Sequence, residues 1–347
     1  MRFNPNGDDS PRPKIDDYLK ETGNEREAES YKRSTYAWNP NLQDGSILRI
    51  TKSSIGTFAW CPQQYYIEKF KGLRGEQEDH HIRGLNVHDV MEWFWANFTD
   101  EQEKLVLKLV AEAHAEYNDV SYSQAREIFF SAIPQPPEPY QFGEDEQIEQ
   151  WLNWQFTRLI STQGEQWRPV GVEANIQATR FVEVDGEQIP IHMNGFIDTL
   201  FADDDGFALM ELKTGKYNKN KPGSMRKEMA FYKMMLEHSP HQEFLPITHW
   251  GWEFPGGGIN GGDGPTIHYE DAKGGGKYAM RSVERSLVKL IKAHIEMDFP
   301  AMPFLGRFKE GLPMEEQNLK CKWCSFEDHC EFWTITDEYL DKIGEEE

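Results

Sequence analysis

Two carboxylates and a lysine are spaced along the middle of the chain so that they could meet on one face of a β-hairpin. An apolar run carries Asp198, an Asp-rich turn closed by Gly206 follows, and a second apolar run carries Glu211 and Lys213. This pattern predicts two strands joined by a tight turn. Because side chains alternate between the faces of a strand, Glu211 and Lys213 point the same way, and Asp198 on the partner strand can reach that face.

These residue types would suit metal-assisted chemistry on a phosphate. Carboxylate oxygens are the ligands that Mg²⁺ and Mn²⁺ prefer, so Asp198 and Glu211 could hold either ion. A lysine beside the metal can orient a water molecule or stabilise negative charge that develops on a phosphate. The alternative is a surface hairpin with an ordinary Glu–Lys ion pair, because Glu-x-Lys is a common tripeptide.

Four cysteines form a second group with the character of a metal site. Three of them follow a Cys-x2-Cys-x5-Cys pattern near the C-terminus, and the group consists of Cys61, Cys321, Cys324 and Cys330. A disulfide framework is disfavoured, because a chain of 347 residues can build its own core. Four thiolates suit a 4Fe–4S cluster or a structural zinc, and zinc ribbons more often carry two Cys-x-x-Cys pairs. Unliganded thiols are the third alternative.

The hairpin and the cysteines together resemble the RecB-like branch of the PD-(D/E)xK nucleases, which includes the CRISPR-associated RecB-like exonucleases. The segment 53–66, with its Cys-Pro pair, resembles the N-terminal helix of that family. Gly84 and His88 match its Gly-x-x-x-His helix. Glu228 and Tyr232 occupy the place of its Gln-x-x-x-Tyr motif, and Glu228 departs from the family pattern there.

The resemblance covers roughly residues 50 to 335 and implies a set of site residues. The implied metal ligands are His88, Asp198, Glu211 and the carbonyl oxygen of Leu212. Lys213 would activate or position the attacking water, and Glu173 is a weaker candidate for the outer shell. Glu228 and Tyr232 lie four residues apart on one helix face, from which Glu228 could support Lys213 by ion pairing. The implied cysteine site is a structural 4Fe–4S staple, with zinc as the alternative.

The implied fold is an α/β restriction-endonuclease-like core, a central mixed β-sheet flanked by helices, with a helical insertion and the four-cysteine staple. The implied function is a Mg²⁺- or Mn²⁺-dependent DNA exonuclease that acts on free DNA ends in recombination, repair, CRISPR adaptation or viral DNA processing. A helicase or a recombination or CRISPR protein is a candidate partner. The alternative is a catalytically silent DNA- or partner-binding module, against which the intact Asp198, Glu211 and Lys213 argue.

The net charge of −22 argues at first sight against a DNA partner, because phosphate contacts are made by Lys and Arg. Its distribution is uneven, however. Between Gly206 and Lys227 there are six basic residues and one acidic residue, so this segment is either a phosphate track or a solvated loop. No run approaches about 18 apolar residues, so we expect no membrane span. We also find no secretory leader pattern, and expect a cytoplasmic protein, which could be encoded by a virus.

The order of patterns along the chain predicts its organisation. We expect a polar, flexible tail over residues 1–45 and a nuclease domain over 46–340. The predicted helices are 52–70, 84–98 with further helix to about 130, 144–162, 224–237 and 280–297. The predicted strands are 170–184, 188–202, 206–213 and 245–254. Within the domain we expect a helical insertion over 84–165, a Gly-rich loop over 255–276 and a cluster-binding segment over 318–335.

Overall fold

The computed structural model describes most of the chain between residues 47 and 330. The described residues are 47–71, 73, 79–132, 144–217, 222–255, 257, 266–306, 317, 319–324, 326 and 330. The predicted tail over 1–45 lies outside them, as do parts of the predicted segments 255–276 and 318–335. None of the described helices is long and apolar enough to span a membrane.

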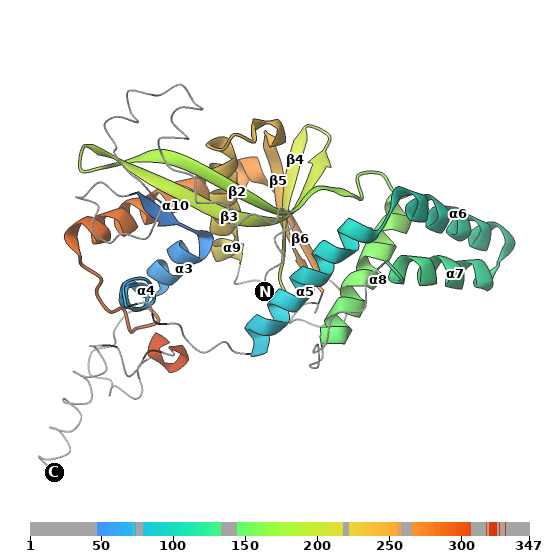
Figure 1. Ribbon diagram of the computed structural model, residues 1–347, viewed down its shortest axis with the longest axis horizontal. Coiled ribbons are helices and arrows are strands. Elements are labelled where there is room, and N and C mark those ends of the chain that lie inside the picture. Colours follow the sequence, from blue (N-terminus) through green and yellow to red (C-terminus); the bar gives the residue numbers. More distant parts are fainter. Residues whose placement is uncertain are drawn as a thin grey trace, which may run out of the picture. The chain divides into compact units, whose positions relative to one another are not determined.

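A mixed β-sheet forms the centre of the fold. Its strand order is β1-β3-β4-β5-β6, and β2 also pairs with β3. The pairings β3–β4 and β5–β6 are antiparallel, whereas β1–β3 and β4–β5 are parallel. The strands are β1 (Leu48–Ile50), β2 (Pro169–Val184), β3 (Glu187–Asp203), β4 (Gly206–Leu212), β5 (Ile247–Phe254) and β6 (Thr266–Asp271). The expected class, a mixed sheet flanked by helices, is confirmed (Figure 1).

The described chain divides into two compact units, and β2, β3 and α10 contribute residues to both. The first unit contains residues 78–176 and 195–281. Its helices are α5 (Asp79–Asn97), α6 (Asp100–Glu116), α7 (Asp119–Phe130), α8 (Glu144–Thr162) and α9 (Pro222–Glu237). Figure 1 shows α6 and α7 as a hairpin that leaves the ends of α5 and α8.

An aromatic core holds α5 to α8 together. Phe94 and Phe98 stack at 5.2 Å between ring centroids, and Phe94 meets Trp151 edge to face at 5.4 Å. All three side chains are buried. Such large aromatic side chains dominate the energetics of a core, and the cluster that they form with the apolar face of α5 also includes Leu212 of β4. Thr99 begins α6 with a capping box, in which its hydroxyl accepts from the N–H of Gln102.

The hairpin β3–β4 is the structural centre of the first unit. Thr199 pairs with Met210, and the pairing continues to Asp203 and Gly206 at the turn. Gly206 is required there, because an added Cβ would lie 2.3 Å from the carbonyl oxygen of Pro246. From Ala208 to the end of β4 every residue is buried, so the register of this strand is strongly fixed.

Of the described residues, the second unit contains those within 47–77, 177–194 and 282–330. It includes β1, α3 (Lys52–Trp60), α4 (Pro62–Lys69), most of α10 (Ala272–Glu296) and the short η4 (Lys320–Trp323). The backbone is extended at Cys61, which ends α3 and precedes Pro62 at the start of α4. The hydroxyl of Tyr65 lies 3.0 Å from Nε2 of His294, which fixes α4 to α10 in a buried contact.

Two predictions of the element pattern are corrected, and one strand is added. The predicted helix over 52–70 consists of two helices, because the chain turns at Cys61. The strand β1 was not predicted. The predicted Gly-rich loop over 255–276 is wrong beyond Thr266, where β6 is followed directly by α10. Glycine disfavours helices by about 1 kcal/mol relative to alanine. Gly276 nevertheless lies within α10, where it packs closely against Trp250: an added Cβ would lie 3.1 Å from the ring.

Candidate active site

The register of the hairpin places Asp198 and Glu211 together. Because Thr199 pairs with Met210 in antiparallel strands, the residue before Thr199 (Asp198) lies opposite the residue after Met210 (Glu211). Asp198 is 5% exposed and Glu211 is 3% exposed. Oδ2 of Asp198 accepts a hydrogen bond of 2.7 Å from the backbone N–H of Leu212. The predicted convergence of two carboxylates at the end of the hairpin is therefore present.

Lys213 lies between two carboxylates at the same place. Its Nζ is 2.9 Å from Oε1 of Glu211 and 2.7 Å from Oε2 of Glu228 on α9. Its backbone N–H donates to the carbonyl oxygen of Glu253 at 2.8 Å, which fixes the chain just beyond the end of β4. The substitution of Glu for the family's Gln at position 228 therefore adds a second negative charge beside the lysine.

Tyr232, one turn beyond Glu228 on α9, is 2% exposed. Burial raises the pKa of its hydroxyl well above the ordinary value, and the carboxylates of Glu211, Asp198 and Glu228 raise it further. The hydroxyl therefore keeps its proton, which it shares in a hydrogen bond with Glu211. Tyr232 is thus a donor that helps to hold a buried carboxylate.

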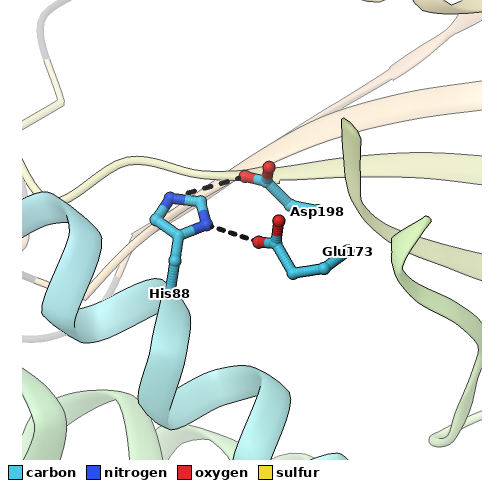
Figure 2. Close-up of side chains that lie close together, drawn as sticks. All are labelled: His88, Glu173 and Asp198. Atoms are coloured by element: carbon cyan, nitrogen blue, oxygen red, sulfur yellow. Dashed lines mark hydrogen bonds and ion pairs between the residues drawn. The ribbon is translucent and has the colours of Figure 1, made fainter. Parts of the chain in front are cut away.

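His88 reaches the site from α5 (Figure 2). Its Nδ1 lies 2.8 Å from Oε1 of Glu173, and its Nε2 lies 3.8 Å from Oδ2 of Asp198. Burial alone would lower the pKa of His88, but the charges of Asp198, Glu173 and Glu211 outweigh it and raise the pKa to about 9. The imidazole thus sits in a strongly negative environment that favours a cation.

Glu173 has a more central place than the sequence indicated. It lies in β2 with φ of 43°, a left-handed conformation that costs a non-glycine residue on the order of 1–3 kcal/mol. Ligand atoms of His88, Glu173 and Asp198 all lie within 4.8 Å of one another. The sequence showed an acidic residue at the start of a strand, but no sequence signal indicated the left-handed backbone.

The residues at the site fit a divalent cation with oxygen and imidazole ligands. Two carboxylates and one imidazole nitrogen form the group of three, and such a set suits Mg²⁺ or Mn²⁺. Glu211 lies outside this group of three, where it accepts from Lys213 and shares a hydrogen bond with Tyr232. The structure therefore brings together the predicted side chains of this site, with Glu173 in the group of three and Glu211 outside it. The role of the Leu212 carbonyl oxygen as a ligand stays a prediction.

The four cysteines meet in the second unit. Cys61, Cys321, Cys324 and Cys330 all line one pocket. Burial raises the pKa of the Cys321 thiol to about 11, and the other three cysteines add to this shift. The backbone N–H of Met302 donates to Sγ of Cys61 at 3.4 Å. Four sulfur atoms in one pocket are a donor set for a soft cation or an iron–sulfur cluster.

The basic segment after Gly206 is only partly available for phosphate contacts. Lys213 is paired as described, and Arg226 makes two hydrogen bonds of 2.6 Å to Glu270. Lys216 and Lys227 are exposed, and the remaining two lysines lie outside the described residues. The phosphate track stays a prediction that would depend on exposed lysines.

Comparison with known proteins identifies a family for the chain. A sequence model described as the PD-(D/E)XK nuclease superfamily matches residues 49–331. No curated protein is significantly similar to the chain. Two solved structures match much of the chain with low identities and low TM-scores. The structure of SSO0001 is 14% identical with a TM-score of 0.28, and the similarity covers 72% of this chain and 96% of that one. A candidate exonuclease from Eubacterium rectale is 13% identical with a TM-score of 0.37, over 76% of this chain and 90% of that one. By the match that spans most of its length, this chain belongs to the PD-(D/E)XK nuclease superfamily.

Proposed function

We propose that the protein is a Mg²⁺- or Mn²⁺-dependent DNA exonuclease that hydrolyses phosphodiester bonds from free ends. The observation that carries the proposal is the convergence of His88, Glu173 and Asp198 beside the Glu211–Lys213 pair. Membership of a nuclease superfamily supports hydrolysis of nucleic acid. The choice of DNA ends comes from the resemblance to RecB-like exonucleases.

In this proposal the carboxylates of Asp198 and Glu173 and the imidazole of His88 would hold the cation. Asp198, Glu173 and His88 supply side-chain ligands, and Glu211 and the Leu212 carbonyl are the further expected ligands. A bound Mg²⁺ or Mn²⁺ would supply a Lewis acid for the phosphate and lower the pKa of a water molecule. The backbone N–H of Leu212 donates a hydrogen bond of 2.7 Å to Oδ2 of Asp198 and so orients that carboxylate.

Lys213 positions the attacking water and stabilises negative charge on the phosphate. Glu228 and Glu211 hold its ammonium from two sides, which restricts where the ammonium can point. Tyr232 donates to Glu211 and so limits the movement of that carboxylate. These contacts preorganise the site before the substrate arrives, which is the main source of electrostatic catalysis.

End-labelled linear DNA and closed circular DNA, each with and without Mn²⁺, test the function. We expect cleavage of linear DNA only with the metal, and little cleavage of circular DNA. Lys213→Ala should be inactive, whereas Lys108→Ala, at an exposed site on α6, should match the wild type. Binding of DNA without any metal-dependent cleavage would instead support the catalytically silent binding module.

We further propose that the cysteine pocket holds a structural 4Fe–4S cluster, with zinc as the alternative. The proposal is supported by the four cysteines that line one pocket. Hydrolysis requires no electron transfer, so we assign the group a role in stability. A brown protein with iron and acid-labile sulfide would support the cluster, and a colourless protein with stoichiometric zinc would refute it.

The biological setting is also a proposal. Free DNA ends arise in recombination, repair, CRISPR adaptation and viral DNA processing, and a helicase or a protein of one of these systems would be the partner. A cytoplasmic location, with the gene carried by a cell or a virus, fits these settings. Pull-down of the full chain from its own host, followed by a cleavage assay with the recovered partner, would test them.

A further inference from the structure

The cysteine pocket contains one feature that metal ligation does not require. Among the described residues that line it, Lys320 is the one with a charged side chain. Lys320 directly precedes Cys321, and it begins the short helix η4. A lysine in a mostly apolar lining loses hydration, so its position calls for compensating contacts.

Those contacts are made with the turn that carries Cys61. Nζ of Lys320 donates a hydrogen bond of 2.6 Å to the carbonyl oxygen of Trp60, and lies 5.0 Å from the centroid of the Trp60 ring. Trp60 is the last residue of α3, where backbone carbonyls lack helical partners and carry partial negative charge. An ammonium is a favourable partner for such a carbonyl.

The backbone around Lys320 is held as well. Its N–H donates to the carbonyl oxygen of Pro303 at 2.6 Å, and Leu319 forms an isolated bridge with Phe304. The adjacent Met302 N–H reaches the sulfur of Cys61 at 3.4 Å. Three short segments, residues 302–304, 319–320 and 60–61, are thus in contact with one another next to the sulfur atoms.

We propose that Lys320 is a positioning residue of the four-cysteine pocket. Its hydrogen bond to the Trp60 carbonyl oxygen holds the segment that carries Cys321 against the turn that carries Cys61, and this contact needs no metal. This inference rests on the proposed metal or cluster binding by the four cysteines. The ammonium has a second effect once thiolates are present, because a positive charge in the lining offsets part of their negative charge. Contacts behind the ligands of a metal typically change its affinity by 10- to 100-fold.

Lys320→Met removes the ammonium and keeps the length and apolar body of the side chain. Lys320→Arg keeps the positive charge and donors, and Lys289→Met, an exposed position on α10, is the matched control. The full chain is stripped with a chelator under anaerobic conditions and titrated with Co²⁺, whose thiolate charge-transfer absorption reports binding. We expect about tenfold weaker Co²⁺ binding in Lys320→Met, partial recovery in Lys320→Arg and no change in the control.

A second measurement, the rate of cysteine alkylation, reports how the hydrogen bond of Lys320 to Trp60 affects the accessibility of the pocket. In the metal-free chain, alkylation of the cysteines by iodoacetamide should be faster in Lys320→Met than in the wild type, because the pocket opens more often. Equal Co²⁺ affinity and equal alkylation rates in wild type and Lys320→Met would overturn the inference. Failure of the wild type itself to bind Co²⁺, iron or zinc would instead refute the proposed cysteine site. Circular dichroism measures the folded fraction of Lys320→Met. If that variant unfolds in part, its alkylation rate is therefore corrected for the unfolded molecules before it is compared with the wild type.

Discussion

Replacement of Glu228 by glutamine tests how the site holds its lysine. Nζ of Lys213 lies 2.7 Å from Glu228 and 2.9 Å from Glu211, so the substitution leaves one carboxylate in place. A hydrogen bond to a charged group contributes about 1.5–3 kcal/mol when it is well shielded. The side chains of Lys213 and Glu228 are 26% and 29% exposed, and glutamine keeps an acceptor oxygen. Both facts reduce the expected loss to about 1 kcal/mol.

That loss corresponds to a small change in rate. A tenfold change requires about 1.36 kcal/mol, so Glu228→Gln should slow single-turnover cleavage by less than about tenfold. The apparent affinity for Mn²⁺ should stay the same. Glu237→Gln, on the same helix and in an ion pair with Lys233 four residues away, is the matched control. Complete loss of cleavage together with weaker Mn²⁺ binding in Glu228→Gln would refute this reasoning and identify Glu228 as a metal ligand.

Three further predictions concern catalysis, metal binding and stability. Lys213→Ala and Asp198→Ala should each abolish cleavage with an unchanged circular dichroism spectrum, and the double variant should be little worse than either, because the two residues act together. Substantial Mn²⁺-dependent cleavage by pure Lys213→Ala would contradict the assignment. His88 has a pKa of about 9 without metal, and a ligand imidazole must be neutral, so Mn²⁺ binding at neutral pH should release about one proton and strengthen as the pH rises towards 9. Calorimetric titrations in buffers of different protonation enthalpy measure the released proton, and identical heats in all buffers would count against it. Cys61→Ser should lose bound iron, become protease-sensitive and aggregate, because a bond from Cys61 to the distant cysteines stabilises the fold by roughly 4–5 kcal/mol by analogy with a disulfide. Unchanged iron content and Tm would show that Cys61 is no ligand.

The hairpin and its site were predictable because short-range patterns determine them. The apolar runs and the Gly-closed turn predicted β3 and β4 almost to the residue, and the alternation of side chains predicted the shared face of Asp198 and Glu211. The position of Lys213 follows from the same period. His88 needed the resemblance to a known family, because no pattern within α5 links that helix to the hairpin.

The elements that were missed depend on long-range packing. β6 is a six-residue strand between glycine-rich stretches, and its pairing with β5 supplies a signal that the local sequence lacks. The start of α10 contains consecutive glycines, which favour a loop by helix propensity alone. In the structure these glycines are helical, and Gly276 packs closely against Trp250. The left-handed backbone of Glu173, whose carboxylate lies 2.8 Å from His88, has no local sequence signal either.

The contact between Lys320 and Trp60 can form only after residue 320 has been synthesised. The two residues are 260 positions apart, so the turn at Cys61 leaves the ribosome long before its partners exist. At roughly 5–20 residues per second, the delay is about 13–52 s. Throughout that interval Cys61 is a thiol without its pocket, open to oxidation or to capture by stray metal ions. The cysteine pocket can close only after Cys330 has been synthesised, and Cys330 follows every residue of the proposed metal site, so a closed pocket marks a chain in which that site has already been made.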